Sequence, residues 1–416
     1  MFEIDKNGMV HTSAIPKQYG TDFLVLREGK GVLLKDTTGK TYLDFGSGIA
    51  VNALGHGRDD LAEVAAAQMR KIIHSSNLYA TEPAMTLAAK LIGSGPFAAV
   101  HFGNSGTEAN EAALKYARLY AYRVKGERCF KLLSFSSAFH GRTLGALSVT
   151  PNPAYRQPYE PLLPGTETCP FNDEAALEKT LDRSFAGVIA EPVQGEGGLT
   201  AMKSSFAAAL NRLCRKHDII LIADEVQTGL GRTGNIFASS AVGLEPDIVT
   251  LAKPLAGGLP LSATLIPAKI NDLLKPGDHG STFGGGPVTT AVASRLWDII
   301  SRPEFLAEVR GKGAFLGEKL ADIAARFSSG PVRVGEVRGL GLMRGLEILA
   351  PEDRTADVMK AILAKAQEKG LLVLRSGRNV VRIAPPLVIS ENEIEKGAAV
   401  LSGALEEVFV SYSKKS

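Results

Sequence analysis

Apolar and polar positions follow three different patterns along this chain of 416 residues. Near the N-terminus, apolar runs at 31–36 and 40–45 flank a short turn at 37–39, which predicts a β-hairpin. From about residue 58 to 300, apolar runs of strand length alternate with stretches of helical periodicity. After about residue 300 the strand-like and helical stretches follow one another in a different order, which indicates a second structural unit.

The middle of the chain predicts an α/β domain. Its strand-like runs are almost continuously apolar, as in strands buried on both faces. The predicted strands are 98–103, 131–136, 186–191, 219–223 and 247–251, and the predicted helices are 61–73, 108–124 and 204–217. Strands that alternate with helices in this way predict a mostly parallel sheet with helices on both faces.

The two ends of the chain predict a smaller α+β domain. Strand-like stretches at 332–337, 341–348, 371–374 and 380–383 surround a helix at 353–369 and precede a final helix at 391–409. We expect residues 1–57 and 301–416 to build this small domain together, and residues 58–300 to form the large one.

Composition narrows the class of protein. Apolar residues make up 45% of the chain and charged residues 22%, which excludes disorder as the main state. No run approaches 18 apolar residues, so no membrane-spanning helix is expected. The first thirty residues include Glu3, Asp5 and Asp22 and lack an apolar core, which argues against a signal peptide. The net charge is only +3 and no Lys/Arg run is present, so neither nucleic acid nor a membrane is expected as a partner.

Cysteine and glycine add two expectations. The three cysteines, Cys129, Cys169 and Cys214, form no C-x-x-C motif, which fits neither a disulfide framework nor a zinc site and favours the cytoplasm; no metal is expected. The 44 glycines are more than an average protein of this length contains, and they are not periodic. We therefore expect them where backbone approaches backbone or ligand closely.

Candidate chemistry is sought at the carboxyl ends of the predicted strands, where open parallel sheets bind ligands. After strand 98–103, Ser105, Gly106 and Thr107 open a helix whose free N–H groups can bind a phosphate, although an ordinary cap by Ser105 or Thr107 is equally typical. After strand 219–223 comes Asp224, which either pairs with a cation (a protonated ring nitrogen, a metal or an arginine) or caps a helix.

A lysine follows the next predicted strand. Lys253 comes after strand 247–251 in a loop of small residues, so it is either a desolvated nucleophile or a lysine whose amine reaches the surface. A phosphate-binding helix start, an acid that can pair with a pyridine nitrogen, and a lysine that can form an imine are together what pyridoxal phosphate requires.

Other motifs weigh less. Residues 229–234 read G-x-G-x-x-G, but residues 224–228 separate them from the strand and no acid lies about 20 residues on, so a dinucleotide-dependent dehydrogenase is a weak alternative. Metalloprotease, serine-hydrolase and P-loop signatures are absent from the sequence. A non-catalytic cofactor-binding protein stays open as a third class.

The motifs as a set resemble the class III pyridoxal-phosphate aminotransferases of fold type I, and are most similar to the acetylornithine aminotransferases among them. The resemblance extends over nearly the whole chain, and its motifs are Phe102–Asn110, Phe139–Thr143, Glu191–Gly198, Asp224–Gly229 and His279–Phe283.

The resemblance implies a role for each matching residue. Lys253 would hold pyridoxal 5'-phosphate covalently and act as the general base, and Asp224 would pair with the ring nitrogen. The other residues implied to bind the cofactor are Ser105, Gly106, Thr107, Phe139, Val226, Gln227 and, from the neighbouring subunit of a homodimer with shared active sites, Thr282. Arg142 and Arg382 would bind substrate carboxylates, Glu196 would neutralise Arg382, and Ser281 would lie near the substrate.

The resemblance also implies the reaction. The terminal amine of N2-acetyl-L-ornithine would pass to 2-oxoglutarate, giving N-acetyl-L-glutamate 5-semialdehyde and L-glutamate, as in arginine biosynthesis. Gly48 and Ala80 stand where ornithine aminotransferases have tyrosines, which leaves volume for an N-acyl group. Succinylornithine, ornithine and 4-aminobutyrate are alternative donors. Pro254 departs from the family pattern and is expected to hold Lys253 in an extended conformation.

Overall fold

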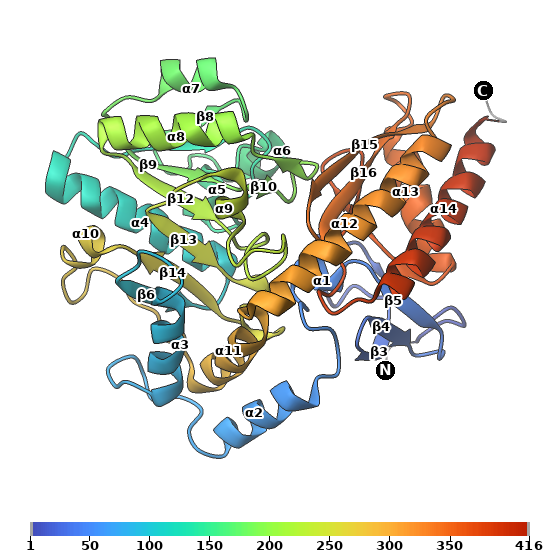
Figure 1. Ribbon diagram of the computed structural model, residues 1–416, viewed down its shortest axis with the longest axis horizontal. Coiled ribbons are helices and arrows are strands. Elements are labelled where there is room, and N and C mark those ends of the chain that lie inside the picture. The colour runs from blue at the N-terminus through green and yellow to red at the C-terminus, as the bar shows by residue number, and fades with distance from the viewer. Residues whose placement is uncertain (1–2, 414–416) are drawn as a thin grey trace.

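The computed structural model describes residues 3–413, and its elements form two units. In Figure 1 the green, cyan and yellow elements surround one sheet, whereas the blue N-terminal strands lie beside the orange and red C-terminal elements. This arrangement confirms the predicted second unit built from both ends of the chain, while the boundaries at residues 57 and 300 stay a prediction. Among residues 3–413 we find no helix with the length and hydropathy of a membrane span.

A seven-stranded sheet is the centre of the larger unit. Its strand order is β6 (Ala99–Gly103), β14 (Ser262–Ile266), β13 (Ile248–Leu251), β12 (Ile220–Asp224), β9 (Phe185–Ala190), β7 (Lys131–Phe135) and β8 (Thr166–Cys169). The pairs β13–β12, β12–β9, β9–β7 and β7–β8 are parallel, and β14 alone runs antiparallel to its neighbours β13 and β6. The predicted mostly parallel sheet is confirmed.

Side chains on the sheet alternate between two apolar layers. In β12, Ile220 and Ile222 join the layer beneath α4, whereas Leu221 and Ala223 join the layer on the opposite face. Each layer is closed by helices because a strand that is apolar on both faces must be covered twice. The longer helices of this unit are α2 (Asp59–Met69), α3 (Glu82–Ile92), α4 (Gly106–Lys125), α7 (Glu174–Thr180), α8 (Ser204–His217) and α11 (Pro287–Ile300).

Short elements connect these strands and helices. They are α5 (Leu144–Ser148), α6 (Pro153–Arg156), η1 (Gln157–Tyr159), β10 (Val193–Gln194), β11 (Thr200–Ala201), α9 (Ala238–Val242), η2 (Lys253–Ala256) and α10 (Ala268–Asn271). The pattern analysis missed β8 and β14. The sequence of β8, TETC, lacks the apolar run that marks a buried strand, because β8 is the sheet's edge.

The smaller unit joins the chain ends through two four-stranded sheets. One has the order β15 (Arg333–Leu340), β16 (Met343–Leu349), β19 (Val380–Ile383), β18 (Leu374–Ser376), and the other β17 (Leu371–Leu372), β5 (Thr41–Asp44), β4 (Leu33–Asp36), β3 (Leu26–Lys30). The predicted hairpin is β4–β5. The remaining elements are β1 (Met9–His11), β2 (Asp22–Leu24), α1 (Ser47–Ala50), α12 (Pro303–Arg326), α13 (Thr355–Glu368) and α14 (Glu391–Ser413), of which only α13 and α14 were predicted.

Candidate active site

A cavity of about 240 Å³ lies where β12 and β13 end and α4 begins. It brings together nine residues that the sequence predicted for the site: Gly106, Thr107, Phe139, Arg142, Glu196, Asp224, Val226, Gln227 and Lys253. Its other lining residues are Asn110, His140, Gly141, Glu191 and Thr228. These residues come from five separate stretches of sequence, and they meet because the carboxyl ends of neighbouring parallel strands share one edge.

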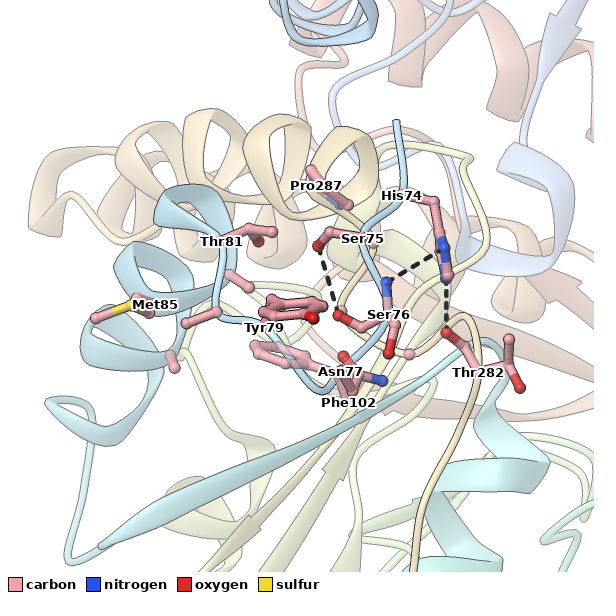
Figure 2. Close-up of a pocket in the computed structure, with 16 residues that line it drawn as sticks. His74, Ser75, Ser76, Asn77, Tyr79, Thr81, Met85, Phe102, Thr282 and Pro287 are labelled. Atoms are coloured by element: carbon pink, nitrogen blue, oxygen red, sulfur yellow. Dashed lines mark hydrogen bonds between the residues drawn. The ribbon is translucent and has the colours of Figure 1, made fainter. Parts of the chain in front are cut away.

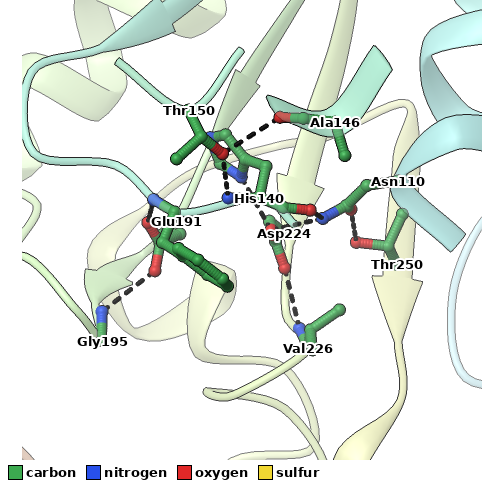
Figure 3. A network of polar contacts seen from close by, with 10 residues as sticks. Asn110, His140, Ala146, Thr150, Glu191, Gly195, Asp224, Val226 and Thr250 are labelled. Carbon is green, nitrogen blue, oxygen red and sulfur yellow. Dashed lines mark hydrogen bonds and ion pairs between the residues drawn. The ribbon is translucent and has the colours of Figure 1, made fainter. Parts of the chain in front are cut away.

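Asp224 is the last residue of β12, and its side chain is buried with 4% exposure. Its Oδ2 accepts hydrogen bonds from Asn110 Nδ2 and from His140 Nδ1, both at 2.7 Å, and its Oδ1 accepts one from the Val226 N–H at 3.1 Å (Figure 3). No helix begins at Asp224, so the helix-cap interpretation is wrong. Three donors fix the carboxylate in place, and Oδ1 retains capacity for one further donor.

A second buried carboxylate lies beside this group. Glu191 accepts hydrogen bonds from the backbone N–H groups of Phe139 and Gly195, each at 2.9 Å. Burial raises the pKa of Glu191 to about 7, against the opposing influence of His140, whose Nε2 has no hydrogen-bond partner within residues 3–413. Asn110, His140 and Glu191 lie inside the quoted motifs, but the sequence analysis gave them no role. Their polar side chains next to predicted site residues were the available signal.

Lys253 begins the short turn η2 directly after β13. Its amine has no hydrogen bond or ion pair within the described chain, and burial lowers its pKa, against the opposing charge of Asp224. The interpretation as a surface lysine is therefore wrong. The extended conformation expected before Pro254 is also wrong: φ of Lys253 is +34°, a region that costs about 1–3 kcal/mol for a residue with a side chain. Lys253 is where the chain turns from β13, which ends at Leu251, into η2.

The start of α4 has both features that the sequence predicted as alternatives, a side-chain cap and free backbone N–H groups. Ser105 is the N-cap, and its Oγ accepts a hydrogen bond from the Glu108 N–H at 3.3 Å. Gly106 and Thr107 follow as the first helical residues and line the cavity, with backbone N–H groups that have no partner inside the helix. A Cβ on Gly106 would lie 2.6 Å from Val226 Cγ1, so only glycine allows this close approach.

Two arginines differ in their surroundings. The guanidinium of Arg142 lies 3.7 Å from the centre of the Tyr155 ring and 5.4 Å from that of Phe139, and it has no acidic partner within residues 3–413. Arg382, on β19, is buried with 4% exposure, and its Nη1 lies 2.5 Å from Glu196 Oε1 and 3.3 Å from Gln227 Oε1. Arg142 is thus free to take a carboxylate, whereas Arg382 is already neutralised.

Ser281, Thr282 and Ala80 lie outside this cavity. Thr282 and Ala80 line a separate hollow of about 280 Å³, where the Thr282 carbonyl accepts a hydrogen bond from His74 Nε2 at 2.9 Å (Figure 2). Ser281 Oγ accepts a hydrogen bond from the Gly284 N–H at 3.0 Å. Gly48 lines neither space and has a φ of +65°.

The glycine-rich segment 229–234 is not a strand–turn–helix unit. It forms a turn-rich loop, and α9 begins only at Ala238. From this loop the buried Arg232 donates hydrogen bonds to the carbonyls of Leu342 and Pro385, which ties the large unit to the small one. The segment has a packing role that the dinucleotide interpretation did not foresee. Among residues 3–413, no group of three or more His, Cys, Asp or Glu side chains is placed to hold a metal.

Comparison with known proteins is consistent across sequence and structure. The family model described as "Aminotransferase class-III" matches residues 14–405. A probable acetylornithine aminotransferase of Dictyostelium discoideum is 43% identical, over 96% of this chain and 87% of its own length. A succinylornithine transaminase of Salmonella enteritidis is 42% identical over 92% of both chains.

Solved structures give the same result. The N-acetylornithine aminotransferase of Stenotrophomonas maltophilia superposes with a TM-score of 0.80 at 33% identity, covering 93% of this chain and 96% of its own. An ornithine aminotransferase of Toxoplasma gondii, described with partial occupancy of PLP at its active site, superposes with a TM-score of 0.87 at 30% identity, covering 94% and 92%.

Proposed function

The chain belongs to the class III aminotransferases, and from this premise we propose that it is a pyridoxal-phosphate enzyme that moves the terminal amino group of N2-acetyl-L-ornithine to 2-oxoglutarate. The products are N-acetyl-L-glutamate 5-semialdehyde and L-glutamate, a step of arginine biosynthesis in the cytoplasm. The observation that carries the proposal is a half-buried Lys253, whose amine has no partner within residues 3–413, in one cavity with the fixed carboxylate of Asp224.

The residues of the cavity fit pyridoxal 5'-phosphate. The N–H groups of Gly106 and Thr107 suit a phosphate, and the missing Cβ of Gly106 leaves Val226 room beside it. Asp224 retains acceptor capacity for a protonated ring nitrogen, Gln227 has an amide for the ring hydroxyl, and Phe139 presents an aromatic face for stacking. When bound, the cofactor supplies a carbonyl that combines with amines and a ring that withdraws electrons.

Lys253 serves two purposes in this proposal. Its amine holds the cofactor covalently between turnovers, and once released it takes the proton from the carbon that bears the donor's amino group. Burial favours the neutral form of the amine by lowering its pKa, which is the form that can accept a proton. Asn110 and His140 hold Oδ2 of Asp224, which leaves Oδ1 available to the ring nitrogen.

Gly106→Ala is expected to weaken cofactor binding by about tenfold or more. Its Cβ would lie 2.6 Å from Val226 Cγ1, so either Val226 or the start of α4 must move. Titration of the apoprotein with pyridoxal phosphate measures the change. Gly403→Ala in α14 is the control, because its Cβ would meet nothing within 4 Å. Equal affinities for the two variants would contradict the phosphate site.

The two arginines bind different carboxylates of the substrates. Arg142 binds the α-carboxylate of the acylated donor and afterwards the side-chain carboxylate of 2-oxoglutarate. Arg382 binds the α-carboxylate of 2-oxoglutarate, which must displace Glu196. While Glu196 stays paired with Arg382, the cavity favours the end of the donor that carries no carboxylate. In the proposed substrate, that end is the terminal amine.

We propose a homodimer in which the hollow of Thr282 and Ala80 completes the partner's cavity. In this chain the hollow shares no residue with the cavity of Lys253. Large apolar side chains in and near it are exposed: Leu78 (88%), Tyr79 (72%), Phe283 (67%) and Met85 (61%). Apolar side chains gathered in this way are typical of a surface that another protein covers.

Ala80→Tyr is expected to raise KM for acetylornithine by about tenfold, because the ring would fill space intended for the acyl group. KM for 2-oxoglutarate should change by less than about twofold, since that substrate has no acyl group. Steady-state kinetics of both substrates measure the difference. Thr81→Ser, the next residue along, is the control. An equal loss for both substrates would contradict this assignment of the hollow.

Rates with acetylornithine, succinylornithine, ornithine and 4-aminobutyrate, each with 2-oxoglutarate, test the donor. We expect acetylornithine to have the highest kcat/KM of the four. A higher kcat/KM for ornithine or 4-aminobutyrate would contradict the proposed donor but would still support a transaminase. A dehydrogenase or a non-catalytic protein would transfer no amino group at all.

A further inference from the structure

Arg142 belongs to a segment, residues 141–146, that packs closely against α4; we call it the arginine segment. Gly141 and Gly145 stand on either side of Arg142, and a Cβ on either glycine would overlap with a side chain of the helix. The atom in the way is Thr107 Oγ1 at Gly141 and Glu111 Oε2 at Gly145. Only glycine allows the backbone of the segment to approach α4 this closely. The arginine is therefore held beside the helix whose first residues line the cavity.

Glu111 ties the arginine segment to α4 by two hydrogen bonds. It is half-buried, and its Oε1 accepts one bond from the Thr143 hydroxyl at 2.5 Å and one from the Ala146 N–H at 3.1 Å. Ala146 lies in the first turn of α5, where N–H groups have no partner inside the helix. Thr143 is the N-cap of α5, but its side chain makes no cap bond. Glu111 thus caps α5 from a neighbouring helix and holds the residue next to Arg142.

The Thr143 hydroxyl also connects Glu111 to the start of α4. Thr143 Oγ1 lies 2.9 Å from Thr107 Oγ1. Because a carboxylate only accepts hydrogen bonds, Thr143 gives its one hydroxyl proton to Glu111, and Thr107 then donates its own to Thr143. The side chain of Thr107 is thus directed to the arginine segment, while its N–H remains available to the cavity. The phosphate site and the arginine segment use different groups of this residue.

Arg142 depends on these contacts because its side chain makes few of its own. Its guanidinium lies against the rings of Tyr155 and Phe139, and it has no hydrogen bond or ion pair within residues 3–413. The ring contacts restrain the side chain but not the backbone that carries it. That backbone is placed by the neighbouring residues that Glu111 holds.

We propose that Glu111 is a positioning residue for the substrate. By holding Thr143 and Ala146, it fixes the backbone from which Arg142 reaches a substrate carboxylate. Glu111 does not line the cavity, so it acts through the arginine segment and touches neither substrate nor cofactor. The inference rests on the proposed function, because it takes Arg142 as the carboxylate site.

Kinetics of the holoenzyme test this role. Glu111→Ala is expected to raise KM for both acetylornithine and 2-oxoglutarate about tenfold, because the carboxylate site is misplaced, whereas kcat falls by less than about threefold. The variant should fold, since alanine is the best helix former. Glu111→Gln should keep both KM values within about twofold, because its amide oxygen can accept the same two bonds. Glu178→Ala is the control, since Glu178 pairs with Arg212 on the surface and lies outside the cavity.

Gly145 offers a double-mutant test. The three atoms nearest to a Cβ at this position all belong to Glu111, so Gly145→Ala must displace the carboxylate. Alone, it should raise both KM values about as much as Glu111→Ala does. Added to Glu111→Ala, it should change them by less than about twofold, because the side chain that it displaces is already gone. Losses that multiply in the double variant would contradict the proposal that both residues act through one contact.

Amide hydrogen exchange gives a readout that needs no activity. Exchange in the peptide that contains Ala146 should be about tenfold faster or more in Glu111→Ala than in the wild type or Glu111→Gln, because the acceptor of this N–H is removed. Unchanged exchange, equal KM changes in the two Glu111 variants, or weaker cofactor binding with unchanged KM would overturn the role of Glu111 and leave the proposed function standing. A wild type that transfers no amino group overturns the proposed function and this inference together.

Discussion

Lys253→Ala is expected to reduce kcat for transamination by at least about 10³-fold, because it removes both the covalent attachment and the general base. The protein should still fold, since the Lys253 amine makes no hydrogen bond or ion pair within the described chain. The measurement is single-turnover and steady-state kinetics of the purified variant with acetylornithine and 2-oxoglutarate.

Chemical trapping distinguishes the loss of the catalytic lysine from a loss of folded protein. Borohydride treatment of the wild type should fix the cofactor on the peptide that contains Lys253, and the variant should show no such adduct. Lys269→Ala is the matched control, because Lys269 pairs with Asp247 at the far end of β13 and lines neither the cavity nor the hollow. A wild type without colour that pyridoxal phosphate cannot reconstitute, or a Lys253 variant with more than about a tenth of the wild-type rate, would contradict the site.

Asp224→Asn is expected to lower kcat by about 10²–10³-fold, the usual loss when one preorganised charged contact in an active site is removed. The amide keeps the shape of the side chain but carries no charge to hold a ring nitrogen protonated. Its NH2 group must also face existing donors, either Asn110 and His140 at the position of Oδ2 or the Val226 N–H at the position of Oδ1. Kinetics at a saturating cofactor concentration separate this loss from weaker binding.

Asp247→Asn is the control for this substitution. Asp247 also accepts a backbone hydrogen bond, from the Leu221 N–H at 2.9 Å, but it lies outside the cavity. We expect its kcat to remain within about twofold of the wild type. Similar losses in the two variants would mean that Asp224 acts through the stability of the fold.

Much of the fold follows from the periodicity of the sequence. The predicted helix at 204–217 coincides with α8, and the runs at 131–136, 186–191 and 219–223 became β7, β9 and β12, because strands buried on both faces must be apolar throughout. The reversed direction of β14 was not predictable, since its pairing partners lie far apart in the chain and a short apolar run does not indicate whether a strand pairs parallel or antiparallel.

The candidate site was also predictable in part, because parallel sheets bind ligands at the carboxyl ends of their strands. Position after a strand pointed to Asp224 and Lys253, and the cavity brings both together. The contacts of His140 with Asp224 and of Glu191 with the backbone depend on three-dimensional packing that no local pattern records. The ring contact between Tyr155 and Arg142 is of the same kind. The proposed role of Thr282 could not be tested in a single chain, because it needs a second copy of the protein.

The pairing of the two chain ends has a consequence for synthesis on the ribosome. Lys40 donates a hydrogen bond to the carbonyl of Gln367, 327 residues later, and Ser47 donates one to the carbonyl of Ala384, 337 residues later. At a typical elongation rate these partners emerge roughly 16 to 65 seconds after the N-terminal strands. Phe45, which is fully buried in the finished protein, therefore waits for its packing neighbours while the entire seven-stranded sheet is being made. The strands near the N-terminus thus wait longer for their partners than any strand of the seven-stranded sheet does.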